Sequence, residues 1–269
     1  LAAYSVGGRL SPDGEGRLFA VLREYLAKAN SVPTDAFYAF ATASLRGLSN
    51  TQRVLAAIKR RLGVEVNVIS GDEEAELDFC ATVKRFGEGI AKKGITVDMG
   101  GGSTEIVGFE DGRKTCGHSF RIGCLAISKR FVKSPLAVTE SELADIKNYV
   151  LSELSSRPEF KNIGGTAYLI GGTARAAAKI FMGVRLGPSS LDGFEMTTED
   201  LFFVRDTVLS DGGAAIKKFS SDRTATVAPG VCALCEVISY CGAERLVISG
   251  AGVREGFVAK MIEERKNAR

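Results

Sequence analysis

The stretch that most constrains the fold is residues 95–107, Ile-Thr-Val-Asp-Met-Gly-Gly-Gly-Ser-Thr-Glu-Ile-Val. Two runs rich in β-branched residues flank three glycines, so this stretch predicts two strands joined by a tight turn. A β-hairpin reverses direction with one or two glycines, whereas three followed by Ser-Thr leave a bare backbone whose N–H groups can approach an oxyanion. Asp98 enters the turn and Glu105 leaves it, where a carboxylate can hold a metal or a water. We therefore favour a phosphate loop over a glycine-rich hairpin with two solvated acids.

The composition limits the class of protein and its partners. The 269 residues, 45% hydrophobic and 25% charged, suit a globular protein with one large or two modest domains. No apolar run reaches the roughly 18 residues of a membrane-spanning helix, so we expect no membrane partner. A formal net charge of +3 is too weak to indicate DNA binding.

The cysteines and the single histidine bear on redox state and on catalysis. Six cysteines without paired spacing favour reduced thiols and a cytoplasmic location. Cys232 and Cys235 lie in an apolar helical pattern, so we expect buried thiols there and no zinc site. His118 is the only histidine, which leaves acid–base chemistry to carboxylates.

The chain before the glycine hairpin alternates between helix and strand patterns. Pro12–Asn30 has helical apolar spacing, and a second helix carries Val54 and Ile58 inward and ends at Gly63. Buried strands are expected at Asp35–Thr42 and Val64–Ile69, with another helix beginning at Ser70. This alternation predicts a parallel α/β sheet.

After the hairpin, Lys114–Phe120 predicts a third consecutive antiparallel strand. A capping box, Thr139 with Glu142, begins one of the following helices. The remaining expected elements are helices at Ile122–Val132, Thr139–Leu154, Ala174–Phe181, Thr198–Leu209, Pro229–Tyr240 and Val253–Arg265, and strands at Thr166–Ile170 and Arg245–Ser249.

The glycine stretch resembles the second phosphate loop of the exopolyphosphatase / guanosine pentaphosphate phosphatase family, which belongs to the actin/hexokinase/heat-shock ATPase superfamily. Four further segments resemble motifs of the same family in the same order. They are Ala41-Thr42-Ala43-Ser44-Leu45-Arg46, Ser70-Gly71-Asp72-Glu73-Glu74-Ala75, Ile170-Gly171-Gly172-Thr173-Ala174 and Ser249-Gly250-Ala251-Gly252-Val253-Arg254-Glu255-Gly256.

The resemblance implies an α/β fold of two ribonuclease-H-like lobes with a cleft between them. Residues 1–92 would form the first lobe and 93–269 the second, with the last helix, about 253–265, packing back on the first. The family's first phosphate loop, Asp-x-Gly-Ser-Asn-Ser, has no counterpart here. The first lobe is therefore expected to be N-terminally truncated, with Leu1–Val6 the last strand of an opening meander and an upstream segment in the natural gene.

The resemblance also implies a reaction, hydrolysis of the terminal phosphoanhydride of polyphosphate or guanosine pentaphosphate. Glu74 would be the catalytic base, and Asp98 and Glu105 would be catalytic residues that hold Mg²⁺. The phosphate-binding residues would be Arg46, Gly100, Gly101, Gly102, Ser103, Gly171, Gly172 and Thr173. A homodimer is a further expectation.

Alternatives stay open at this point. An arginine after a strand, such as Arg46, is by itself more often a surface ion pair, and Glu73 has the spacing of a helix cap with Ser70. An ATP-dependent kinase of the same fold and a non-catalytic sensor of polyphosphate or guanosine pentaphosphate are the competing functions. Asp192, where the family often has histidine, and the loosely matching segment 222–226 leave the substrate preference open.

Overall fold

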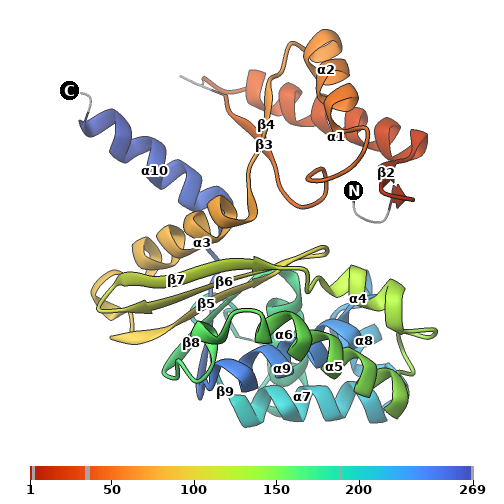
Figure 1. Ribbon diagram of the computed structural model, residues 1–269, viewed down its shortest axis with the longest axis vertical. Coiled ribbons are helices and arrows are strands. Elements are labelled where there is room, and N and C mark those ends of the chain that lie inside the picture. Colours follow the sequence, from red (N-terminus) through yellow and green to blue (C-terminus); the bar gives the residue numbers. More distant parts are fainter. Residues whose placement is uncertain (2–3, 34–36, 188, 268–269) are drawn as a thin grey trace. The chain divides into compact units, whose positions relative to one another are not determined.

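The computed structural model describes residues 1, 4–33, 37–187 and 189–267, and the chain divides into two compact units, Leu1–Gly71 and Asp72–Arg269. The first unit contains β1 (Ser5–Val6), β2 (Arg9–Leu10), α1 (Pro12–Asn30), β3 (Ala39–Ala41), α2 (Thr51–Leu62) and β4 (Val66–Val68) (Figure 1). β3 and β4 pair in parallel, as the sequence pattern predicts.

Local signals account for the helices of the first unit. Ser11 caps α1 by accepting a hydrogen bond from the Gly14 N–H, and a proline occupies the first turn. α2 ends at Gly63, which has a left-handed φ of 67°. The predicted strand Asp35–Thr42 is shorter in the structure, because only Ala39–Ala41 pairs with β4, and residues 35–36 lie outside the described residues. Of the predicted strand Leu1–Val6, Ser5–Val6 forms β1, which pairs with Arg9–Leu10, while residues 2–3 lie outside the described residues.

The second unit is built on a six-stranded sheet ordered β7-β6-β5-β8-β10-β9. Its strands are β5 (Lys93–Met99), β6 (Thr104–Glu110), β7 (Arg113–Phe120), β8 (Thr166–Ile170), β9 (Glu195–Thr197) and β10 (Arg245–Ile248). Its helices are α3 (Gly71–Phe86), α4 (Cys124–Phe131), α5 (Glu140–Ser155), α6 (Gly171–Arg185), α7 (Thr198–Ser210), α8 (Ala214–Phe219), α9 (Val227–Cys241) and α10 (Val253–Asn267), with 3₁₀ turns η2 (Gly87–Gly89), η3 (Pro158–Phe160) and η4 (Ser221–Arg223).

The strand pairing confirms the predicted antiparallel meander followed by parallel strands. β5, β6 and β7 are antiparallel neighbours, and β8 pairs in parallel with both β5 and β10. α5 begins at the predicted capping box of Thr139 and Glu142. The edge strand β9 and the short helix α8 were not anticipated, because three and six residues carry too little periodicity to be recognised.

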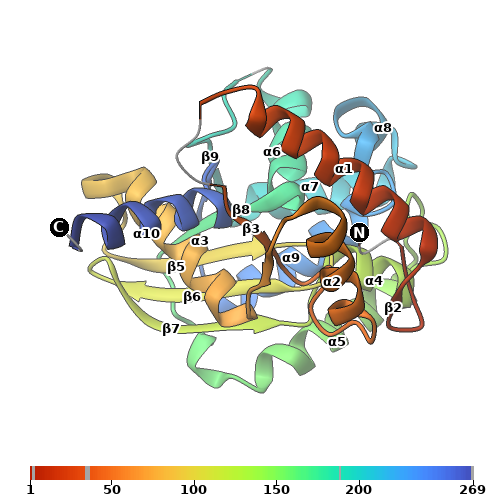
Figure 2. The same cartoon turned by 90° about the horizontal axis from the view of Figure 1, so that it is seen from above.

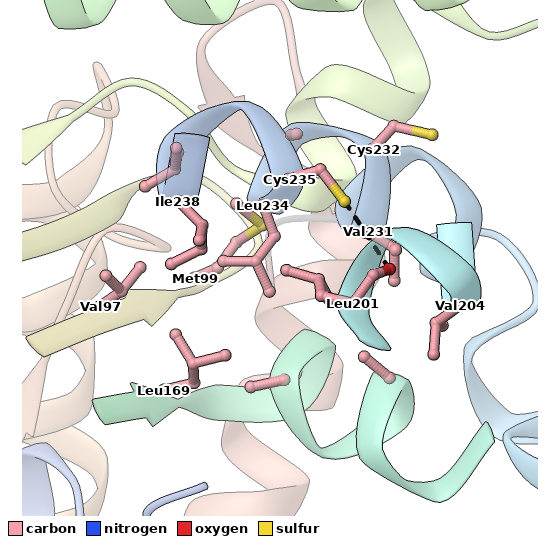
Figure 3. Close-up of a cluster of buried hydrophobic side chains, with 14 of the residues drawn as sticks. Val97, Met99, Leu169, Leu201, Val204, Val231, Cys232, Leu234, Cys235 and Ile238 are labelled. Atoms are coloured by element: carbon pink, nitrogen blue, oxygen red, sulfur yellow. Dashed lines mark hydrogen bonds between the residues drawn. The ribbon is translucent and has the colours of Figure 1, made fainter. Parts of the chain in front are cut away.

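The two faces of this sheet bury different side chains. On one face, Val97 and Leu169 meet residues of α7 and α9, including Leu201, Leu234 and Ile238, in a large apolar core (Figure 3). α9 is buried almost throughout, and Cys232 and Cys235 lie there as the predicted free thiols. Burial raises the pKa of Cys232 to about 12, so this thiol stays protonated.

The opposite face of the sheet is covered by α3 (Figure 1), and α10 crosses α3 (Figure 2). Ala75 and Phe79 of α3 pack on Val107, Tyr168 and neighbouring side chains of the sheet. For this reason the structure divides the chain at Gly71–Asp72 and not at the predicted position between residues 92 and 93. α3, which the prediction placed with the first lobe, belongs to the second unit.

The last helix, α10, contacts α3, and both helices of this contact belong to the second unit, so its packing on the first lobe stays a prediction. A Cβ on Gly256 of α10 would overlap the Leu77 carbonyl oxygen of α3, so the two backbones are in direct contact. Among the described residues, no helix has both the length and the apolar character needed to cross a membrane.

Candidate active site

Two carboxylates lie side by side where β5 and β6 approach the glycine turn. Asp98 and Glu105 are directly paired across these strands, and Ile170 of β8 is the next residue in the same row. Paired residues point to the same face, here the face covered by α3, because Thr96, Val107 and Tyr168 form the next row on that face. The structure thus brings together the two acids that the sequence placed on either side of the turn.

Glu74 and Asp78 lie one turn apart on α3, above this row. Both are buried, and Glu74 repels the charge of Asp98 and of Glu105. Burial, together with this repulsion, raises the pKa of Asp98 to about 7 and that of Glu105 to about 8. The predicted base and both predicted metal ligands therefore occupy one acidic cluster.

Hydrogen bonds orient Glu105. The Ser119 hydroxyl of β7 donates to Glu105 Oε1 at 2.6 Å, and the Ser103 hydroxyl is a second partner that favours the charged form. Ser103 was predicted to bind phosphate, and in this structure its hydroxyl lies against the carboxylate. These two contacts lower the pKa of Glu105 but do not outweigh burial.

The glycine turn is packed against the start of α4. Gly100 and Gly101 accept hydrogen bonds through their carbonyl oxygens from the N–H groups of Cys124 and Leu125, at 3.0 and 3.1 Å. A Cβ on Gly123 would overlap Gly101 and Gly102, so that position requires glycine. Within the described part of the chain, no protein acceptor is seen for the Gly101 and Gly102 N–H groups, and adjacent N–H groups of this kind can face an anion.

The second glycine segment lies at the N-terminus of α6, beside Asp98. Gly171 has a φ of 90°, and a Cβ there would overlap Asp98 Oδ1. The helix begins at Gly171, three residues earlier than predicted, and no side chain caps it. Such an N-terminus, with its N–H groups and helix dipole, attracts anions. Thr173 is buried and packs against Gly230, so its side chain contributes to packing there.

Two basic side chains near this segment were not singled out from the sequence. The Arg223 guanidinium covers Gly172 so closely that a Cβ on the glycine would overlap it. Arg175, on the first turn and a half of α6, lowers the pKa of Asp98 through its charge. Arg223 belongs to the segment 222–226 noted above, but only the folded chain shows that it reaches the glycines.

Arg46 belongs to the first unit, at the carboxyl ends of β3 and β4. Its backbone N–H donates to the Thr42 carbonyl, and its Nη1 donates to the Ile69 carbonyl at 3.1 Å. The side chain is therefore fixed by the end of the neighbouring strand segment and is not a freely solvated surface group.

The motif of residues 249–256 and Asp192 make hydrogen bonds to other groups of the protein. The Glu255 carboxylate accepts a hydrogen bond from the Gly252 N–H at 2.9 Å, at the start of α10. Asp192 accepts from Arg85 Nε and from the Gly250 N–H, both at 2.8 Å. Burial opposes its ionisation, but these contacts prevail, and the pKa of Asp192 is lowered.

The cluster suits a hydrated divalent cation. Among the described residues, no three histidine, cysteine, aspartate or glutamate side chains are placed to hold a metal ion by themselves. Mg²⁺ commonly takes one or two carboxylates and keeps several waters. Asp98 and Glu105 supply hard oxygen ligands of that number, side by side on neighbouring strands.

The strand order and the two glycine segments beside a carboxylate pair define an α/β protein with a candidate anion site at one edge of its sheet. Within that class, the chain belongs to the Ppx/GppA phosphatase family, whose model matches residues 2–265.

Individual relatives agree with this assignment. The guanosine-5'-triphosphate,3'-diphosphate pyrophosphatase of Pseudoalteromonas translucida is 25% identical over 273 residues, which cover 99% of this chain and 53% of that protein. The chain thus spans about half the length of this curated relative.

Solved structures share the fold. An exopolyphosphatase-like protein superposes with a TM-score of 0.85 at 23% identity, covering 94% of this chain and 84% of that one. The exopolyphosphatase of Cytophaga hutchinsonii superposes with a TM-score of 0.83 at 19% identity, covering 98% of this chain and 88% of that one. The Aquifex aeolicus member of the Ppx/GppA family superposes with a TM-score of 0.78 at 24% identity, covering 96% of this chain and 84% of that one.

Proposed function

We propose that the chain provides the catalytic part of a phosphohydrolase that removes the terminal phosphate of inorganic polyphosphate or guanosine pentaphosphate. The observation that carries this proposal is the row of Glu105 and Asp98 beside the uncapped N-terminus of α6, with Glu74 above it. A carboxylate cluster next to the first-turn backbone N–H groups of a helix suits a reaction that places water and a phosphoryl group together.

Each residue has a part in this proposal. Glu74 orients and deprotonates the attacking water, because it is a buried carboxylate within the electrostatic reach of the pair. The N–H groups at Gly101, Gly102 and Gly171–Thr173 bind phosphate oxygens, and Arg223 adds positive charge over Gly172. Arg46 keeps the phosphate-binding role that its motif implies.

Mg²⁺ is the proposed metal, held by Asp98 and Glu105. When bound, it would neutralise charge on the phosphoryl oxygens. The protein would act in the cytoplasm, and a homodimer remains part of the proposal.

Phosphate release from long-chain polyphosphate and from guanosine pentaphosphate tests the function. We expect release from at least one substrate with Mg²⁺ present, and loss of release in EDTA. Asp98→Asn and Glu105→Gln should each raise the Mg²⁺ concentration needed for half-maximal release, because each removes a hard anionic ligand. Release that survives chelation unchanged would contradict the metal site.

The same assay separates the competing functions. Phosphate that appears on added ADP and not in solution would indicate a kinase. Binding of polyphosphate without any turnover, in a chain that is folded by circular dichroism, would indicate a sensor. Either outcome would overturn the proposed hydrolysis.

A further inference from the structure

Asp78 lies outside the five motifs and has no part in the proposed reaction. It lies on α3 one helical turn after Glu74, and only 1% of it is exposed. Neither of its carboxylate oxygens has a hydrogen-bond partner among the described residues. A buried carboxylate without a donor is strongly unfavourable, so such a side chain needs an explanation.

The neighbours of Asp78 place it beside the carboxylate row. A Cβ on Gly252 would lie 3.4 Å from Asp78 Oδ1 and 3.0 Å from Ile170 Cγ2. Ile170 is directly paired with Asp98 across β5 and β8. Asp78 therefore lies near Ile170 of β8. Ile170 belongs to the same cross-strand row as Asp98 of β5 and Glu105 of β6.

The charges around Asp78 make its burial more costly. Burial, followed by repulsion from Asp98, Glu105 and Glu74, raises the pKa of Asp78 well above its ordinary value. The Val253 N–H at the start of α10 lies close enough to favour the charged form slightly, but makes no hydrogen bond of acceptable geometry. Four acids thus lie close together, three of them buried and Asp98 partly exposed.

A hydrated cation would supply what this region lacks. Mg²⁺ is held by few direct carboxylate ligands and keeps waters whose O–H groups point outward. Such waters are donors for a nearby carboxylate, and partners of this kind outside the direct ligands tune metal affinity. Asp78 has the burial and the two free acceptor oxygens that this role requires.

We propose that Asp78 is a positioning residue that accepts a hydrogen bond from a water of the divalent cation held at Asp98 and Glu105. This inference rests on the metal site proposed above. The competing explanation is structural: Asp78 would serve only to attract the N-terminus of α10 through the Val253 N–H.

Metal binding by the full chain, measured without substrate, tests this proposal. Mn²⁺ titrations by calorimetry and thermal unfolding in EDTA or Mg²⁺ are compared for the wild type, Asp78→Asn and Asp78→Leu. Asp72→Asn is the matched control, because it removes the same charge from the same helix at a side chain that is 73% exposed. We expect both Asp78 variants to bind Mn²⁺ about 10–100-fold more weakly, and the control to bind as the wild type does.

The unfolding temperatures separate the two explanations. In EDTA, Asp78→Asn and Asp78→Leu should unfold at or above the wild-type temperature, because both remove a buried carboxyl group that has no hydrogen-bond partner. Their stabilisation by Mg²⁺ should be smaller than that of the wild type. If Asp78 serves only to attract the N-terminus of α10, both variants should instead unfold below the wild-type temperature in EDTA. Their affinity for the metal should then equal that of the wild type.

Each remaining outcome is also decisive. If the wild type binds neither Mn²⁺ nor Mg²⁺, the metal site itself is wrong, and Asp78 has no cation to position. If the wild type binds and the Asp78 variants bind equally well, only the present inference fails. Failure of both variants to fold in EDTA would overturn it too, because it requires the metal-free fold to tolerate loss of this charge.

Discussion

At the scale of single residues, Asp98 and Glu105 form an unusual cross-strand pair, because like charges directly opposite each other weaken a sheet. Burial and the charge of Glu74 raise their pKa values to about 7 and about 8. In the metal-free fold, both carboxyls therefore keep protons at a pH where the unfolded chain has released them. Such groups stabilise the fold fully at low pH, and that contribution is lost as the pH rises through the folded-state pKa values.

The metal-free protein should therefore lose stability between about pH 4 and about pH 8. Urea unfolding in EDTA at pH 5 and at pH 8 measures this difference as a fall in the midpoint. Asp98→Asn should make the dependence shallower, because one of the two titrating groups is gone. A midpoint that stays level or rises with pH would show that these carboxyls ionise normally in the fold.

Glu74 and Glu73 are adjacent and differ in their expected roles. Glu74→Gln should reduce turnover by about 10²–10⁴, because the base is lost while the shape of the side chain is kept. Glu73→Gln should act on helix stability, by roughly 0.5–2 kcal/mol, if it caps α3 as its spacing predicts. Turnover and thermal unfolding of both variants are the measurements, and equal turnover in the two would exclude Glu74 as the base.

At the scale of elements, the contact between the start of α6 and the end of β5 depends on Gly171. Gly171→Ala should destabilise the fold by more than the roughly 1–3 kcal/mol that a strained backbone conformation costs, because the new Cβ also overlaps Asp98. Gly212→Ala is the control for strain alone, since Gly212 has a φ of 63° and no atom within 4 Å of an added Cβ. If both variants lose the same free energy of unfolding, the overlap with Asp98 adds nothing to the cost of the strained backbone.

The elements also show what the sequence can and cannot reveal. Helices with caps and a clear apolar stripe, such as α1 and α5, are close to their predicted bounds, and α2 ends at the predicted Gly63. The meander was predictable because its turns and alternating strands are local. The assignment of α3 to the second unit was not, because it depends on packing between Phe79 and Phe109, which lie far apart in sequence.

The candidate site shows the same difference between residues with a local sequence signal and residues without one. Glu74, Asp98 and Glu105 lie in local motifs and were predicted, and the structure brings them into one cluster. Asp78 and Arg223 carry no local signal, since an acid in a helix and an arginine in a loop are ordinary features of a sequence. Their positions become informative only when Gly252 and Gly172 bring other segments against them.

At the scale of the whole molecule, the two units differ in the size of their cores. The first unit buries a small set of apolar side chains, namely Leu10, Phe19, Leu45, Val54, Ala57, Ile58 and Val64, while the second has the extensive core around α9. Small units bury a smaller fraction of their surface and are less stable by themselves.

Hydrogen exchange at increasing urea concentrations should therefore show amides of α1 and α2 losing protection before those of α9 and β8. Leu45→Ala should lower protection in the first unit, and Ile238→Ala in the second, because each opens a cavity in its own core. Loss of protection at a single urea concentration throughout the chain would show that the units unfold together.

The contact between Gly256 and the Leu77 carbonyl has a mechanical consequence. A side chain at an interface can change rotamer and absorb a displacement, but two backbones in contact cannot. A displacement of α10 at Gly256 would therefore have to move the backbone of α3 at Leu77, one turn of helix after Glu74.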